Sequence, residues 1–235
     1  MTAYTPAVIS NDQINNWQTL TSDKNQKIWC SNDKQMIMKL TALLSYNDRL
    51  VFEVKDLHRF LFEQIRWSDT QVQTTRDGLD RNTLGLNALD KFSFRFLKNW
   101  SLVSLLNKIC FSKIIQLKSK HLLKTASSIA MITIPGTEKQ NYLHGGQTWQ
   151  RFLLQLASEN LTTQPIAGLA LLMQSSYEDI LENKISPKQH AKLLNIRQEL
   201  LGIINADERT TILAIFRIGH GPNVIRAIRK PLKSL

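Results

Sequence analysis

Apolar residues recur at helical spacing along most of the chain, and only a few short apolar runs are typical of strands. Several helical stretches follow Ser, Asn or Asp, whose side chains accept hydrogen bonds from the N–H groups of a first helical turn. We expect helices at residues 11–20, 36–44, 54–67, 68–76, 87–97, 145–160, 166–173 and 187–204. Strands are predicted at 26–30, 127–134 and 211–217, with a tight connection over 161–167. Many helices and few strands predict an α+β fold, built as a single domain over residues 1–235.

The last predicted strand leads into a basic C-terminal segment. The apolar run ends at Arg217, and a turn rich in Gly and Pro follows at 219–222. The cations beyond this turn include Arg226, Arg229 and Lys230. A strand that delivers a turn and then a group of cations is one way to build an anion-binding corner. A core strand followed by a solvated basic tail explains the same pattern.

The charge balance favours anionic partners. The chain has 30 Lys and Arg against 19 Asp and Glu, a formal charge of +11. Nucleic acid, a phosphate-bearing cofactor and an anionic membrane surface all fit this charge. The sequence contains no apolar run of membrane-spanning length and no signal-peptide pattern at its start, so we expect a cytoplasmic protein. The two cysteines and five histidines show no metal-ligand spacing, and no metal site is predicted.

The segment 91–124 is both basic and amphipathic. No Asp or Glu stands between Lys91 and Thr137, while lysines and large apolar residues alternate through the segment. Such a pattern is typical of a surface that binds nucleic acid or an anionic membrane. It is equally typical of two helices that pack on a core with their lysines turned outward.

Few residues of the chain indicate catalysis on their own. The self-contained signatures of nucleotide, zinc and serine-nucleophile sites are missing from the sequence. Charged residues crowd the loop 76–81, where mutual ion pairing or a carboxylate acid/base site would explain them. We therefore expect no catalytic side chain, and if the protein is an enzyme, a cofactor performs the chemistry.

The order of several short motifs resembles the nitroreductase superfamily, and in particular its longer, divergent Acg-type branch. In the second half of the chain these motifs are Gly145-Gly146, Gln150-Arg151-Phe152-Leu153, Gln164-Pro165, Arg217-Ile218-Gly219 and Arg229-Lys230-Pro231-Leu232. In the first half they are Asn47-Asp48-Arg49-Leu50, Ile65-Arg66-Trp67-Ser68 and Arg76-Asp77-Gly78-Leu79. The resemblance runs from Tyr4 to the C-terminus, and it rests on the order and spacing of the motifs.

This resemblance implies an FMN-dependent oxidoreductase with helices packed around a small, mostly antiparallel sheet. It implies a homodimer and hydride transfer from NAD(P)H, through the flavin N5, to a nitro compound, a quinone or a similar electrophile. Residues that match the turn against the isoalloxazine ring are Gln164, Pro165 and Ile166. The cations Arg229 and Lys230 match a pair that contacts the FMN phosphate, and Arg226 is a further candidate.

The chain departs from the family pattern at its start. Family members begin with an arginine-rich helix for the FMN phosphate and a polar segment, and Tyr4 matches a position after both. We therefore expect a fold that lacks its N-terminal portion and part of the phosphate clamp. The alternatives to a flavoenzyme are a non-enzymatic protein of the same fold with lost or weakened flavin binding, and a nucleic-acid or membrane binder acting through residues 91–124.

Overall fold

The computed structural model describes residues 2–84, 94–221, 228 and 230. These residues form two compact units. The sheet unit comprises Tyr4–Asn47 and Leu123–Gly221, and the helical unit is built on Asp48–Leu122 and includes Lys230. The assignment of the whole chain to a single domain stays a prediction. Within the described residues, no helix is both long enough and apolar enough to cross a membrane.

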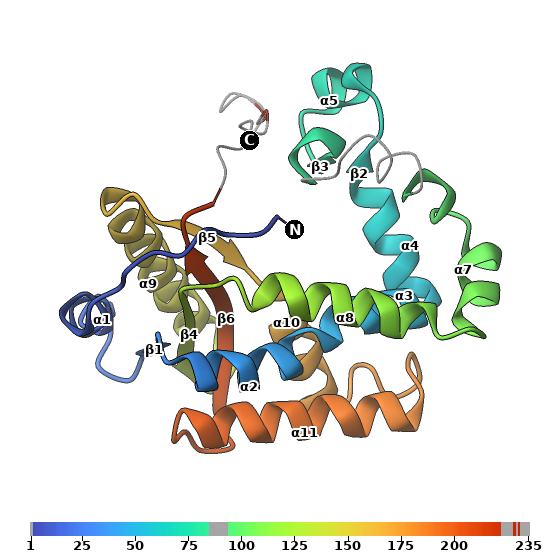
Figure 1. Cartoon of the computed structure of the whole chain (residues 1–235). Coiled ribbons are helices and arrows are strands. Elements are labelled where there is room, and N and C mark those ends of the chain that lie inside the picture. The colour runs from blue at the N-terminus through green and yellow to red at the C-terminus, as the bar shows by residue number, and fades with distance from the viewer. Residues whose placement is uncertain (1, 85–93, 222–227, 229, 231–235) are drawn as a thin grey trace. The chain divides into compact units, whose positions relative to one another are not determined.

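A four-stranded antiparallel sheet, in the order β1-β4-β6-β5, is the centre of the sheet unit (Figure 1). Its strands are β1 (Lys27–Ser31), β4 (Ser128–Pro135), β5 (Thr162–Pro165) and β6 (Thr210–Gly219). The two central strands, β4 and β6, are almost completely buried. Their apolar runs are what the sequence predicts for strands covered on both faces. The strands predicted at 26–30, 127–134 and 211–217 are therefore confirmed.

Helices cover both faces of this sheet. They are α1 (Asn11–Gln18), α2 (Lys34–Leu44), α9 (Lys139–Ser158), α10 (Ala167–Tyr177) and α11 (Pro187–Ile203). Figure 1 shows α9 and α10 on opposite sides of β6, and α11 packs against α10. Trp17 of α1 and Phe152 of α9 are fully buried against Phe216 and its neighbours on the sheet. Because both faces are covered, the sheet is the core of this unit.

Capping residues set the starts of several helices as predicted. Ser10 and Ser186 each form a capping box with a glutamine three residues on, and Asp33 accepts a hydrogen bond from the Met36 N–H. Each cap satisfies a first-turn N–H group that has no partner inside the helix. Local sequence thus determines where α1, α2 and α11 begin.

The helical unit is built around a cluster of aromatic side chains. Its elements are α3 (Tyr46–Glu53), α4 (Lys55–Gln64), β2 (Ile65–Arg66), α5 (Asp69–Thr75), β3 (Leu79–Asp80), the 3-10 helix η1 (Arg81–Leu84), α7 (Trp100–Asn107) and α8 (Phe111–Leu123). The ring of His58 is 1% exposed among Phe52, Phe62 and Trp100. Its Nε2 lies 2.8 Å from the Leu97 carbonyl oxygen, and burial lowers the pKa of His58. His58 is therefore a packed core histidine.

Three predicted boundaries are wrong, each because pairing or packing overrides the local pattern. The helix predicted at 54–67 stops at Gln64, since Ile65 and Arg66 form strand β2 beside β3. The connection predicted at 161–167 instead contains the edge strand β5, which pairs with β6. Helix α9 begins before Gly145, which lies inside the helix against the sheet. The helix predicted at 87–97 lies mostly outside the described residues.

Candidate functional site

The corner between β5 and α10 holds three of the residues predicted to contact a cofactor. Gln164 and Pro165 end the edge strand β5, where they pair with Arg217 and Phe216 of β6. The N–H of Ile166 donates to the Ile215 carbonyl at 2.7 Å, which continues the sheet bonding into the start of α10. These backbone bonds fix the direction in which α10 leaves the sheet.

The first turn of α10 is open to an acceptor from outside the helix. Its N-cap residue, Ile166, is apolar and provides no side-chain hydrogen bond to the first-turn N–H groups. Such uncapped N–H groups, together with the helix dipole, favour negative charge or carbonyl oxygens at this end. Pro165 and Gly168 are exposed beside them and bring little side-chain bulk. This end of α10 therefore favours a group that carries negative charge or hydrogen-bond acceptors.

Gly168 is needed for the way that α10 packs. A Cβ atom at this position would lie 2.7 Å from Oδ1 of Asn47, which is closer than carbon and oxygen can approach. Any larger residue would therefore push Asn47 or the first turn of α10 away. The site residues predicted from the sequence at this corner end with Ile166, so the prediction missed Gly168 and its contact with Asn47. A glycine soon after a proline at a helix start was a usable signal for Gly168.

A buried arginine supports the same corner from the sheet. Arg217 is 1% exposed, and its Nε donates to Gln164 Oε1 at 2.7 Å. Its guanidinium lies 4.1 Å from the centroid of the Tyr4 ring, a distance typical of a cation–π contact. Burial raises the pKa of Tyr4, while the charge of Arg217 opposes this shift. Arg217 thus holds the Gln164 side chain in place.

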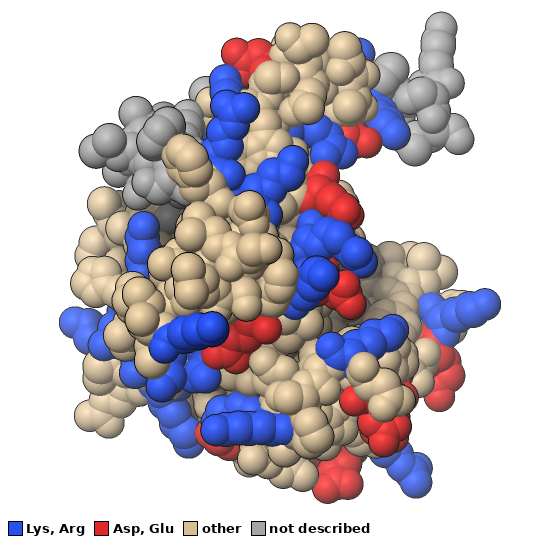
Figure 2. Space-filling view, turned by 90° about the vertical axis from the view of Figure 1, so that its right-hand side faces the viewer, with Lys and Arg blue, Asp and Glu red and all other residues tan. Residues whose placement is uncertain are grey.

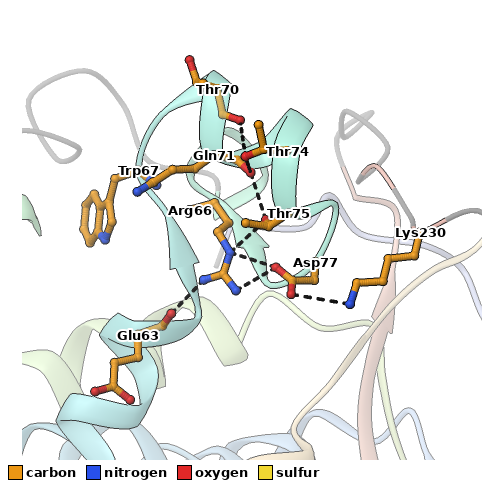
Figure 3. Close-up of polar contacts among 9 residues, drawn as sticks. All are labelled: Glu63, Arg66, Trp67, Thr70, Gln71, Thr74, Thr75, Asp77 and Lys230. Atoms are coloured by element: carbon orange, nitrogen blue, oxygen red, sulfur yellow. Dashed lines mark hydrogen bonds and ion pairs between the residues drawn. The ribbon is translucent and has the colours of Figure 1, made fainter. Parts of the chain in front are cut away.

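Lys230, the predicted phosphate ligand, lies beside a carboxylate in the helical unit (Figure 3). Its Nζ is 4.0 Å from Asp77 Oδ2, and its side chain is 53% exposed. Arg66 holds Asp77 more firmly, because Nε and Nη2 both donate to Oδ1, at 3.0 and 2.7 Å. These hydrogen bonds from Arg66 lower the pKa of Asp77, and Lys230 adds a smaller effect. Asp77 therefore stays ionised beside Lys230 at neutral pH.

Lys230 retains capacity to bind a second anion. A separation of 4.0 Å is too long for a hydrogen bond, so the ammonium N–H groups are not committed to Asp77. All three nitrogens of Arg66, in contrast, donate to Glu63, Thr75 or Asp77. The sequence suggested ion pairing within the loop 76–81, but the ion pairs found among the described residues join this loop to residues outside it: Asp77 pairs with Arg66 and Lys230, and Arg81 with Asp69.

The predicted site residues fall into three groups. Gln164, Pro165 and Ile166 lie together at the β5–α10 corner of the sheet unit. Lys230 lies with Asp77 in the helical unit. Arg226 and Arg229 lie outside the described residues. Within the described residues, no three His, Cys, Asp or Glu side chains gather closely enough to hold a metal ion.

Comparison with known proteins identifies the fold. No protein-family model and no curated protein sequence matches the chain. Among solved structures, an FMN-dependent nitroreductase from Clostridium difficile R20291 is 10% identical, with 98% of this chain and 89% of that chain covered and a TM-score of 0.52. The FMN- and NADPH-dependent nitroreductase NfnB from Sphigopyxis sp. strain HMH is 12% identical, with 99% and 91% covered and a TM-score of 0.50. The chain therefore has the α+β fold of the nitroreductases, as its sequence motifs predict.

Proposed function

We propose that the protein binds FMN and acts as an FMN-dependent oxidoreductase of the nitroreductase type. The observation that carries the proposal is the start of α10 at the β5–α10 corner, which has no side-chain cap, in a chain with the nitroreductase fold over nearly its whole length. The two similar structures are described as FMN-dependent nitroreductases. At 10% and 12% identity they support the fold, so the cofactor rests on the residues of this chain.

The described residues at the β5–α10 corner fit the ring end of FMN. At the β5–α10 corner, the first-turn N–H groups of α10 suit the carbonyl oxygens of an isoalloxazine ring, and the exposed Pro165 and Gly168 leave space beside them. For the phosphate, the family resemblance names Lys230, Arg226 and Arg229, and of these Lys230 has a half-exposed side chain. Asp77 works against this phosphate contact, since it places a negative charge 4.0 Å from Lys230.

Bound FMN would supply hydride transfer at its N5 atom. The chain itself would bind and orient the flavin, with the dipole of α10 stabilising negative charge on the ring. Arg217 would keep Gln164 in position at the edge of the site through their hydrogen bond. No side chain is assigned as a catalytic acid or base, because the proposed chemistry requires none.

The finer parts of the proposal come from the family resemblance. The hydride donor would be NAD(P)H, and the acceptor a nitro compound, a quinone or a similar small electrophile. The protein would work as a homodimer in the cytoplasm. These features stay predictions of the sequence, together with membership of the Acg-type branch.

Reconstitution and turnover test this function. The purified chain is incubated with FMN, separated from free flavin and assayed for NADH and NADPH oxidation with a quinone or a nitroaromatic acceptor. We expect a yellow protein whose NAD(P)H oxidation depends on the acceptor. Bound FMN without turnover would favour a non-enzymatic flavoprotein. A colourless chain that retains no FMN would reject the proposal and favour a nitroreductase-fold protein that has lost its cofactor.

A further inference from the structure

Helices α7 and α8, from the basic segment of the sequence, each have one side fixed against the helical unit. Val103 is fully buried in the aromatic core, and Phe111 and Ile115 pack against the same core. Asn107 donates to the Phe52 carbonyl oxygen at 2.6 Å and accepts from the Ser112 N–H at 3.1 Å. The prediction that this segment forms two helices packed on a core is therefore correct. These contacts also determine which sides of the two helices are left to face outward.

The outward sides of α7 and α8 carry large aliphatic residues that the core does not use. The exposed fractions are 36% for Leu102, 60% for Leu105, 72% for Ile109, 57% for Ile114 and 66% for Leu117. Isolated apolar residues on a surface are ordinary, but four in two consecutive helices and one, Ile109, in the turn between them form an unusual group. We call these five, with the exposed residues Lys108, Lys113 and Lys118 between them, the lysine–aliphatic face.

The charged residues that define this face, Lys108, Lys113 and Lys118, are all basic. No acidic residue occurs between Lys91 and Thr137 in the sequence, and residues 91–93 lie outside the described structure. Glu53 contacts α8 from the inner side, where it accepts from Ser112 and forms an ion pair with Arg49. Figure 2, which looks from the side on which α7 lies in Figure 1, shows uncharged surface bordered by Lys and Arg side chains, with fewer acidic ones. The partner of this face should therefore be anionic and also accept aliphatic side chains.

We propose that the lysine–aliphatic face docks the protein on an anionic lipid membrane. Aliphatic side chains can enter the boundary between headgroups and acyl chains, while lysines beside them contact acidic headgroups. On α8 the two kinds of side chain lie on one exposed face, since Lys113 and Leu117, like Ile114 and Lys118, are four residues apart. The face thus combines the two interactions that hold a peripheral protein on a membrane.

Two other partners fit this face less well. Nucleic-acid surfaces that contact bases use arginine forks and aromatic rings that stack on the bases. In α7 and α8 the basic residues are lysine and histidine, and the aromatic residues, Trp100 and Phe111, pack in the core. A second copy related by a twofold axis would bring the same face against itself, which would place lysines against lysines. An anionic lipid surface meets neither objection.

Vesicle binding by the full chain tests the proposal. Partition is measured by cosedimentation with vesicles of phosphatidylcholine mixed with phosphatidylserine, and with vesicles of phosphatidylcholine alone. One variant removes charge (Lys113→Gln with Lys118→Gln), and another removes apolar surface (Ile114→Ser with Leu117→Ser). Matched controls change exposed residues of the sheet unit, namely Lys188→Gln with Lys192→Gln, and Leu154→Ser. All the altered side chains are exposed, so the variants should fold normally, which circular dichroism verifies.

We expect binding to the mixed vesicles, weak binding to neutral ones and a loss of binding at high salt. Each removed lysine should lower the partition constant about fivefold, or about 25-fold for the pair. The Ile114/Leu117 variant should lower it about tenfold or more, while both controls behave as the original chain.

Three results would overturn the proposal. Equal binding to both kinds of vesicle would show that headgroup charge is not recognised. RNA or DNA binding that depends on Lys113 and Lys118, without vesicle binding, would assign the face to nucleic acid. A change from dimer to monomer in the Ile114/Leu117 variant, again without vesicle binding, would assign it to a second copy of the chain.

Discussion

Two neighbouring glycines inside α9 provide a sharp test of how that helix packs on the sheet. Gly145 faces β4 and β6, where a Cβ atom would lie 2.5 Å from Cδ2 of Leu213 and 2.8 Å from Cγ2 of Ile134. At Gly146, an added Cβ would meet no other atom within 4 Å. Gly145→Ala and Gly146→Ala therefore add the same methyl group to the same helix in two opposite environments.

The expected energies have opposite signs. Alanine in place of glycine inside a helix stabilises the folded state by about 1 kcal/mol, and Gly146→Ala should gain this amount. Gly145→Ala gains the same propensity, but forcing a methyl group into a filled core costs about 1–3 kcal/mol. Leu213 can move the end of its side chain, whereas the contacting methyl of Ile134 is attached to the Cβ of a fully buried, β-branched residue. We therefore expect Gly145→Ala to be less stable than Gly146→Ala by about 1–3 kcal/mol.

Thermal unfolding followed by far-UV circular dichroism measures this difference. For a chain of this length, 1 kcal/mol corresponds to about 2–4 °C, so Gly146→Ala should raise Tm by about that much. Gly145→Ala should leave Tm unchanged or lower it. If both substitutions raised Tm equally, α9 would not approach the sheet as closely as the structure describes.

Three further predictions concern single side chains. Burial raises the pKa of the Cys30 thiol to about 12, so a thiol reagent should label only the exposed Cys110 in the native chain. The Cys110→Ala variant retains only Cys30, and its rapid labelling would contradict this prediction. Burial lowers the pKa of His58 in the folded state, so below pH 6.5, the ordinary pKa of histidine, the unfolded state binds more protons than the folded state and the free energy of unfolding should fall. Urea unfolding of His58→Phe should therefore depend less on pH than that of the original chain. An equal pH dependence would refute this prediction. Lys230→Gln should weaken FMN binding about tenfold or more, because a hydrogen bond to a charged group contributes about 1.5–3 kcal/mol. Quenching of flavin fluorescence measures this, with Lys192→Gln as the control; equal affinities would remove Lys230 from the phosphate site.

Local chemistry made much of the fold predictable from the sequence. Ser10, Asp33 and Ser186 cap helices where their side chains indicate, and the apolar runs of β4 and β6 form the buried centre of the sheet. Features that depend on distant partners were missed. Strand β5 is four residues long and ends in proline, so only its pairing with β6 reveals it. Gly145 resembles a helix boundary, but it is a helix interior that must approach the sheet.

The candidate site was predictable to a similar extent. The Gln164-Pro165 turn follows from its order in the chain, and the structure places it at the start of α10. The contact between Gly168 and Asn47, and the carboxylate of Asp77 beside Lys230, join positions far apart in the sequence. Such contacts have no local signature, since neither partner has an unusual neighbourhood in the chain.

The visible absorption spectrum of the purified protein, before and after addition of FMN, tests the central claim most directly. The proposed flavin site predicts that FMN stays with the protein through gel filtration and shows the absorption bands of an oxidised, protein-bound flavin. It also predicts that these bands bleach when NADH or NADPH is added without oxygen. A protein that remains colourless after incubation with excess FMN would contradict the claim.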